Sequence, residues 1–214
     1  MREQLLVAIL GLALAGCGDG SKATANEAQA DATAPRPVPC SVERHGMGAV
    51  IGGKPGAPCD DSVDPQTLAL DALIRIIPDQ HPSFYYVLAQ RLFAADRRDE
   101  AVFWFYAGQL RYRIRLSCHP DLRPDTEPAL FGSLHETVGR PINEYGFGDL
   151  PALIATLERV LAWDAETRNG FEPKAACASQ IAEQREGLGQ LIRQLRDNGA
   201  NIRRDRAANG LPNR

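Results

Sequence analysis

The 214-residue sequence predicts an all-α fold, a compact domain of about six helices built on a helical hairpin. Apolar residues recur at helical spacing through most of residues 64–200, and no segment shows the alternation of a strand. Residues 101–116 are apolar in nearly every helical direction, which is typical of a helix that neighbours cover on all sides. With 44% hydrophobic residues, a chain of this length can bury a proper core.

End signals mark the first three helices of this domain. Asp64-Pro65 provides an N-cap and a first-turn proline for a helix that Pro78 stops. Ser83 is the expected N-cap of a second helix near residues 84–95. A short polar turn then leads into the central helix, which we expect to reach about Leu116.

The second helix and the central helix together resemble one tetratricopeptide or Sel1-like hairpin. The family spacing is matched by Tyr85-x2-Leu88-Ala89-x2-Leu92, followed by Ala101-x3-Phe105-x2-Gly108. The match covers about one repeat, has Arg113 where the closing proline would fall, and has no second copy. One repeat cannot stack into a solenoid. The resemblance therefore implies a helical hairpin and a binding role, but no repeat groove.

The second half of the domain is predicted to hold three helices separated by Gly-rich and Pro-rich segments. In order, these elements are a helix at 127–138, a loop at 139–149, a helix from Pro151 to about Asn169, and a final helix from about Pro173 to about Asn198. Asp149 can cap the helix that follows it. Residues 201–214 are predicted to be a flexible basic tail.

The first residues are typical of a secretory signal peptide. An apolar run at residues 5–14 follows a charged start and is too short to span a bilayer as a mature helix. At Leu14-Ala15-Gly16-Cys17 the chain resembles the bacterial lipobox, in which the cysteine is acylated and the chain is cleaved before it. The resemblance implies a signal peptide at residues 1–16 and a stable lipid anchor at Cys17.

The segment behind this anchor is predicted to be a linker. Residues 17–39 are mostly small and polar with a Pro-rich end, so they cannot bury enough apolar surface to fold. Gly18 follows the lipidated cysteine, which resembles the pattern of lipoproteins sent to the outer membrane. We therefore expect a protein of the cell envelope that is anchored in the outer membrane and faces the periplasm.

Four further cysteines, Cys40, Cys59, Cys118 and Cys177, predict disulfides in an exported chain, with three pairings possible. We favour Cys40 with Cys59, which closes an irregular segment at residues 40–63. We pair Cys118 with Cys177, which ties the end of the central helix to the C-terminal segment. A metal site is the alternative, but the spacing contains no Cys-x-x-Cys pair, and we expect no metal.

No catalytic signature in the sequence is complete. His135-Glu136 begins like a zinc-protease helix, but Gly139 stands where the second histidine is needed. Gly52-Gly53-Lys54 lacks the spacing of a phosphate loop, so we expect no nucleotide or other cofactor. A formal net charge of −3 gives no sign of nucleic-acid binding.

Two groups of residues are candidates for binding a protein partner. Trp104, Arg111 and Arg115 share a stripe on the central helix and have the chemistry enriched at interface hot spots. Alternatively, this tryptophan belongs to the core and both arginines pair with acids of neighbouring helices. The second group lies in the predicted loop and either projects as a contact surface or packs down to seat the next helix. It consists of Asn143, Glu144, Tyr145 and Phe147.

These observations lead to two functional hypotheses. The first is a lipid-anchored, periplasmic helical protein that binds an envelope or secreted protein and has no catalytic activity. It would act as an immunity protein against a periplasm-acting toxin or as an envelope-assembly adaptor. The second hypothesis is a small hydrolase of envelope polymers that uses His135 and Glu136.

Overall fold

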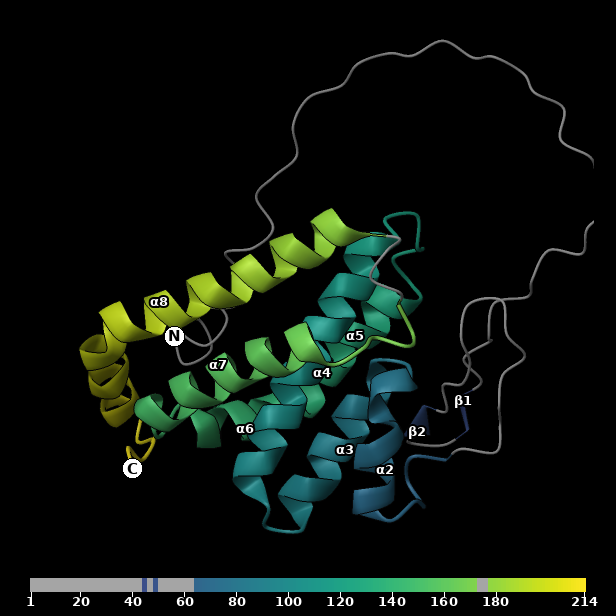
Figure 1. Cartoon of the computed structure of the whole chain (residues 1–214). Helices are drawn as coiled ribbons and strands as arrows, with labels where there is room; N and C mark the ends of the chain where they lie inside the picture. The colour runs from purple at the N-terminus through teal and green to yellow at the C-terminus, as the bar shows by residue number, and fades with distance from the viewer. Residues whose placement is uncertain (1–43, 46–47, 50–63, 173–176) are drawn as a thin grey trace, which may run out of the picture. The chain divides into compact units, whose positions relative to one another are not determined.

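A computed structural model describes residues 44–45, 48–49, 64–172 and 177–214, and these residues confirm the all-α fold (Figure 1). The helices are α2 (Leu70–Ile76), the 3-10 helix η1 (Ile77–Asp79), α3 (Ser83–Ala94), α4 (Arg98–Cys118), α5 (Glu127–Thr137), α6 (Gly139–Gly146), α7 (Leu150–Glu166) and α8 (Ala178–Ala208). Two short strands, β1 (Arg44–His45) and β2 (Gly48–Ala49), pair antiparallel.

Helix α4 is the centre of the helical body, as the sequence predicts. It packs against α3, α5, α6, α7 and α8, and most of its residues are buried, from Ala101 near one end to Arg115 near the other. A helix with neighbours on every side needs no single apolar stripe. This explains why its apolar residues point in nearly all directions.

Helices α3 and α4 form the predicted hairpin, joined by the turn at residues 95–97. Asp96 in this turn has a φ of 61°, a left-handed conformation that aspartate tolerates better than most residues. Gly108 of α4 lies against α3 so closely that a Cβ there would be 2.5 Å from the Cβ of Tyr85. The absence of a side chain at this position therefore sets the distance between the two helices.

A disulfide joins Cys118, at the end of α4, to Cys177, the residue before α8. This bond confirms one of the two predicted pairings. Cys17, Cys40 and Cys59 lie outside the described residues, as do the predicted signal peptide and linker at residues 1–16 and 17–39.

The prediction of a loop at residues 139–149 is wrong, because most of this segment is helix α6. Ile142, Asn143 and Gly146 on one face of α6 are buried, and Gly139 brings the start of the helix against the ring of Phe105. The glycines thus allow close packing here, where the sequence alone suggested chain flexibility. Asp149 does cap α7, since its side chain accepts a hydrogen bond from the backbone N–H of Ala152.

The predicted break near Asn198-Gly199 is also wrong, because α8 continues to Ala208. Gly199 is buried beside Leu150, and both Ile202 and Arg206 are buried further along the helix. The final residues fold back onto the body instead of extending into solvent as the predicted tail. The backbone N–H of Arg214 donates to the carbonyl oxygen of Gly148 at 2.6 Å.

Candidate functional site

The stripe on the central helix is buried. Trp104, Arg111 and Arg115 are 8%, 1% and 7% exposed. The alternative interpretation is therefore confirmed: the tryptophan belongs to the core, and the arginines pair with carboxylates of other segments. This stripe cannot serve as a contact surface in the folded protein.

Arg111 belongs to a buried ion-pair cluster that joins three helices. Its Nε lies 2.5 Å from the carboxylate of Asp164 in α7, and its guanidinium faces the ring of Trp163 at 4.8 Å. Arg185 of α8 donates to the same carboxylate at 2.6 Å. Arg111 also donates to the backbone oxygen of Thr167 at 3.1 Å. The cluster therefore links α4, α7 and α8 through one carboxylate.

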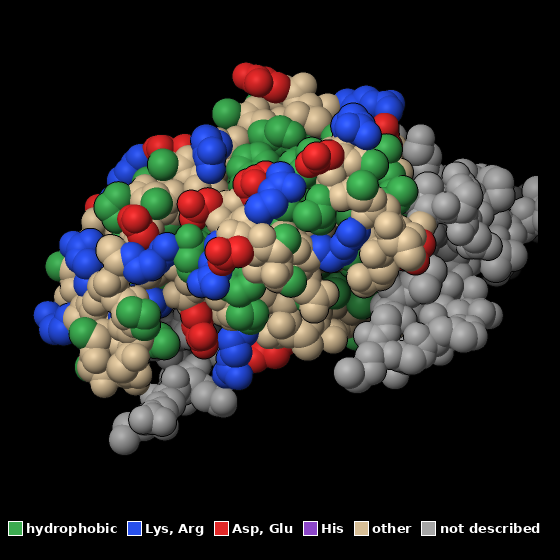
Figure 2. Space-filling view, turned by 90° about the horizontal axis from the view of Figure 1, so that it is seen from below, with side chains coloured by type: hydrophobic (Ala, Val, Ile, Leu, Met, Phe, Trp, Pro, Cys, Tyr) green, Lys and Arg blue, Asp and Glu red, His purple; other side chains and the backbone are tan. Residues whose placement is uncertain are grey.

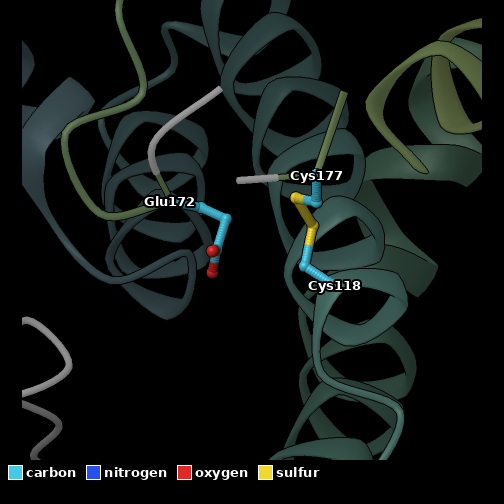
Figure 3. A group of neighbouring side chains, drawn as sticks. All are labelled: Cys118, Glu172 and Cys177. Atoms are coloured by element: carbon cyan, nitrogen blue, oxygen red, sulfur yellow. A yellow bond between two sulfur atoms is a disulfide. The ribbon is translucent and has the colours of Figure 1, made fainter. Parts of the chain in front are cut away.

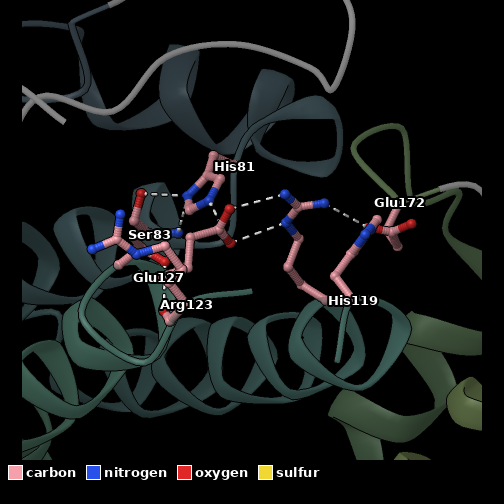
Figure 4. A network of polar contacts seen from close by, with 8 residues as sticks. His81, Ser83, His119, Arg123, Glu127 and Glu172 are labelled. Carbon is pink, nitrogen blue, oxygen red and sulfur yellow. Dashed lines mark hydrogen bonds and ion pairs between the residues drawn. The ribbon is translucent and has the colours of Figure 1, made fainter. Parts of the chain in front are cut away.

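Arg115 anchors a second buried network, at the junction of α3, α4 and α5 (Figure 4). It donates to both carboxylate oxygens of Glu127, at 3.0 and 2.9 Å, and to Glu172 at 3.1 Å. His81 contacts Glu127 at 3.4 Å, and His119 bonds Glu172 at 2.9 Å. One guanidinium thus holds two carboxylates, and each carboxylate also meets a histidine.

His81 has the capping role that we expected of Ser83. Its Nδ1 accepts the backbone N–H of Ser83 at 3.2 Å and lies 2.8 Å from the hydroxyl oxygen of that serine. Because Nδ1 accepts, Nε2 carries the proton and points it at Glu127. Serine, histidine and carboxylate are lined up, but the serine and the histidine are each 4% exposed. A substrate in solvent cannot reach the hydroxyl, and the arrangement serves to hold the start of α3.

The charges in this network follow from burial and hydrogen bonding. Burial opposes ionisation of Glu127, but hydrogen bonds from His81 and Arg115 outweigh it and lower the pKa of Glu127 to about 2. At His81 burial is the largest effect and lowers the pKa, so this imidazole is neutral at neutral pH. Arg115 and Glu127 therefore form an ion pair with the neutral His81 beside it, which is a structural arrangement.

Among the described residues, one group has ligand atoms close enough together to hold a metal, all within 4.8 Å of one another (Figure 3). The group consists of Cys118, Glu172 and Cys177. The two sulfur atoms are bonded to each other in the disulfide, so neither is a thiolate ligand. The carboxylate of Glu172 is bonded to Arg115 and His119. In the oxidised protein this group stabilises the junction and has no free ligand set.

Most of the second candidate group is also inside the protein. Asn143 and Phe147 are 6% and 3% exposed, and the hydroxyl of Tyr106 donates to the Asn143 side chain at 2.8 Å. Glu144 is half-buried, and its backbone oxygen accepts a hydrogen bond from Arg206. These residues seat α6 on the body, which was one of the two interpretations of the segment.

Tyr145 is half-buried and stays at the surface, surrounded by groups from three other segments. The guanidinium of Arg214 lies 3.6 Å from its ring centroid and that of Arg98 lies at 5.6 Å. Phe93 meets the ring edge-on at 5.9 Å, and the tyrosine hydroxyl donates to Asp99 at 2.9 Å. We call Phe93, Arg98, Asp99, Tyr145 and Arg214 the Tyr145 patch.

The sequence alone did not point to the other members of this patch. Phe93 lies in the last turn of α3 and Arg98 begins α4, so only the turn between the two helices places both beside α6. Arg214 lies in what we predicted to be a flexible tail. The one sequence signal for its docking is Leu211-Pro212, an apolar pair that is unusual in a solvated basic segment.

His135 and Glu136 point in different directions from α5. His135 is half-buried, its Nδ1 lies 3.2 Å from the side-chain nitrogen of Gln109, and its ring lies 5.6 Å from that of Phe105. Glu136 is exposed. The two side chains do not share a site, so the hydrolase hypothesis has no paired catalytic groups at these positions.

The environment of His135 predicts a pH-dependent stability. Burial, and then the charge of Arg113, lower the pKa of His135 to about 4 from the ordinary value of 6.5. Between these values the unfolded chain binds more protons than the folded chain, so stability falls as pH falls through this window. We expect His135→Asn to weaken this dependence, measured as the melting temperature at pH 7, 5.5 and 4. Buried His81 acts in the same direction and should leave a residual slope. An unchanged slope in the variant would contradict the assignment to His135.

Comparisons with known proteins place the chain in no family. No family model matches it, and no curated protein or solved structure is significantly similar. The resemblance to a tetratricopeptide or Sel1-like hairpin and the lipobox at residues 14–17 therefore stay predictions. Among the described residues, none of the helices combines the length and apolar character needed to cross a bilayer.

Proposed function

We propose that this protein is a lipid-anchored, periplasm-facing helical module that binds an envelope or secreted protein. It acts as an immunity protein against a periplasm-acting toxin or as an envelope-assembly adaptor. The Tyr145 patch is the observation that carries the proposal, because it presents two guanidiniums and two aromatic rings at the surface. Tyrosine and arginine are among the residues enriched at interface hot spots.

The patch is organised before any partner arrives. Arg214 is held by its backbone bond to Gly148 and by a side-chain bond to the Tyr145 carbonyl at 3.0 Å. The tyrosine ring is held by Phe93 and by its bond to Asp99. Little side-chain entropy is lost when such a surface binds, which favours affinity.

The face of the molecule in Figure 2 suits a separable complex better than a permanent one. On the face shown in Figure 2, hydrophobic side chains lie in small groups divided by basic and acidic side chains. Non-obligate interfaces have this mixed character, whereas permanent ones are more apolar. An immunity protein or an adaptor, each of which meets its partner after folding alone, fits this surface.

The binding role is tested by crosslinking in intact cells, followed by capture of the anchored protein and identification of its partners. We expect Tyr145→Ala and Arg98→Ala each to reduce capture of the main partner by about tenfold or more, as for a hot-spot residue. Arg196→Ala removes an equally exposed arginine on α8 that lies outside the patch, and it should have no effect. Equal capture by wild type and both patch variants would refute the patch as the binding surface.

The identity of the captured protein separates the two forms of the proposal. A secreted toxin supports the immunity role, and a resident assembly protein supports the adaptor role. The anchor is tested in the same cells with Cys17→Ser, which should move the protein from the membrane fraction to the soluble fraction. Continued membrane association of this variant would contradict the lipid anchor.

A further inference from the structure

The group of Cys118, Glu172 and Cys177 has the donor atoms of a zinc site, except that its two sulfurs are bonded to each other. Both sulfurs and one carboxylate oxygen lie within 4.8 Å of one another, and Figure 3 shows the carboxylate beside the disulfide. Bonds from zinc to thiolate sulfur and carboxylate oxygen are about 2.0–2.3 Å long. One ion between these three atoms can therefore reach all of them after small shifts.

Glu172 is 5% exposed and is held in place by its neighbours. Its Oε2 accepts a hydrogen bond from Arg115 at 3.1 Å and lies 2.9 Å from Nε2 of His119. Its backbone N–H donates to the side chain of Asn169 at 3.0 Å. Among the described residues, no hydrogen bond ends on its other oxygen, Oε1. Metal-binding carboxylates are commonly oriented by such outer groups, and here one oxygen is held while the other keeps its lone pairs.

Contacts other than the disulfide keep the two cysteines together. Gln184 near the start of α8 donates to the hydroxyl of Ser117 near the end of α4 at 2.9 Å. The ion-pair cluster around Asp164 also links α4 to α8. The Cα atoms of Cys118 and Cys177 are 5.8 Å apart. After reduction the two thiols therefore stay neighbours, and the site does not have to be assembled from distant parts.

We propose that reduction of the disulfide between Cys118 and Cys177 converts this group into a zinc site. Zn²⁺ takes thiolate and carboxylate ligands, whereas Mg²⁺ and Ca²⁺ prefer oxygen ligands alone. The two sulfurs and Glu172 fill three tetrahedral positions, and the fourth is open to water. Zinc then links α4 to α8 where the disulfide links them in the oxidised chain. The spacing of the cysteines did not predict this site, because Glu172 meets the sulfurs only through packing.

The reductant is a dithiol. One of its thiolates attacks a sulfur of the disulfide, and its second thiolate then displaces the protein sulfur from the mixed disulfide. The dithiol loses two electrons and becomes a disulfide, while Cys118 and Cys177 gain two electrons and two protons. When zinc binds, each thiol releases its proton to solvent and becomes a thiolate ligand. The disulfide and the zinc-bound form therefore exclude each other.

The test uses the full chain carrying Cys17→Ser, Cys40→Ser and Cys59→Ser, so that Cys118 and Cys177 are its only cysteines. The chain is measured oxidised, and again after reduction by a dithiol that is removed without air. Zn²⁺ is titrated against a chromogenic chelator, and Co²⁺ is added separately because its charge-transfer absorption reports thiolate ligation. The reduced chain should bind one equivalent of Zn²⁺ and show this absorption, and the oxidised chain should do neither. Excess Mg²⁺ should not compete.

Glu172→Gln in the same background tests the carboxylate ligand. It keeps the disulfide and an oxygen acceptor for Arg115 but loses the negative charge, so the reduced chain should bind Zn²⁺ about tenfold more weakly or worse. Glu127→Gln is the matched control, because it changes the other carboxylate that Arg115 holds and lies outside the metal-binding group. This control should keep the zinc affinity. The melting temperatures of the oxidised forms check that each variant is folded.

The proposal is overturned if the reduced and oxidised chains bind Zn²⁺ equally, or if Glu172→Gln binds it as tightly as Glu127→Gln. Absence of the charge-transfer absorption with Co²⁺ would also overturn it, because the cysteines would then not be ligands. None of these measurements uses a partner protein or a membrane. The result is therefore independent of the Tyr145 patch and of the lipid anchor.

Discussion

Replacing Asp164 with alanine is expected to destabilise the protein by about 3–5 kcal/mol, the largest loss we predict for a single substitution. Asp164 is 1% exposed, and its carboxylate lies between Arg111, which is also 1% exposed, and Arg185. Removing the carboxylate leaves the guanidinium of Arg111 buried without its counter-ion. The loss should appear as a lower midpoint of urea unfolding with a similar slope.

Two controls separate the buried charge from other effects of this substitution. Glu158→Ala breaks an exposed ion pair with Arg196, so it should cost less than about 1 kcal/mol. The double variant Asp164→Leu/Arg111→Met removes both buried charges and should recover most of the stability. If the double variant is as unstable as Asp164→Ala, the effect comes from altered packing and the ionic explanation is wrong.

Gly108→Ala is expected to destabilise the protein by about 2 kcal/mol, although alanine is the better helix former. The added Cβ would lie 2.5 Å from the Cβ of Tyr85, which is fixed to the backbone of α3 and cannot rotate away. The hairpin must therefore widen, and overpacking of this kind costs about 1–3 kcal/mol or more. The gain in helix propensity, about 1 kcal/mol, offsets only part of that cost. Urea unfolding measures the net change.

Gly187→Ala is the matched control for this prediction. Gly187 lies in α8, and a Cβ there would have no neighbour within 4 Å. The substitution should raise stability by up to about 1 kcal/mol through helix propensity alone. Changes of the same sign at the two positions would show that the approach of α3 and α4 does not depend on Gly108.

The helices of this protein are largely predictable from local pattern. The hairpin, the central helix and the cap at Asp149 all follow from spacing and end signals, and the structure has them where we expected. The helix predicted to begin after Asp64 starts only at Leu70, and the cap expected of Ser83 is provided by His81. Two further errors are at glycines. Gly139 and Gly199 look like breaks in the sequence, but each lies in a helix against a neighbouring side chain.

The candidate surfaces were less predictable than the helices. The stripe of Trp104, Arg111 and Arg115 has the residue types of a binding surface, but it is buried. Arg111 forms an ion pair with Asp164, and Arg115 forms ion pairs with Glu127 and Glu172. The carboxylates come from segments 12 to 57 residues away from Arg115, and no local pattern links them. Of the second candidate group, which lies in α6 and just after it, only Tyr145 lies at the centre of a surface cluster.

Local sequence was sufficient for the class of fold, the hairpin and one disulfide, because helix periodicity, capping and an even number of cysteines are short-range or compositional properties. Packing decided which faces are buried, because burial depends on the neighbours that a helix meets and not on its own residues. The orphaned hydroxyls of Tyr86 and Tyr112 illustrate the difference most clearly. Both look like ordinary core residues in the sequence, and only the packing of α3 against α4 leaves their hydroxyls buried without a hydrogen-bond partner.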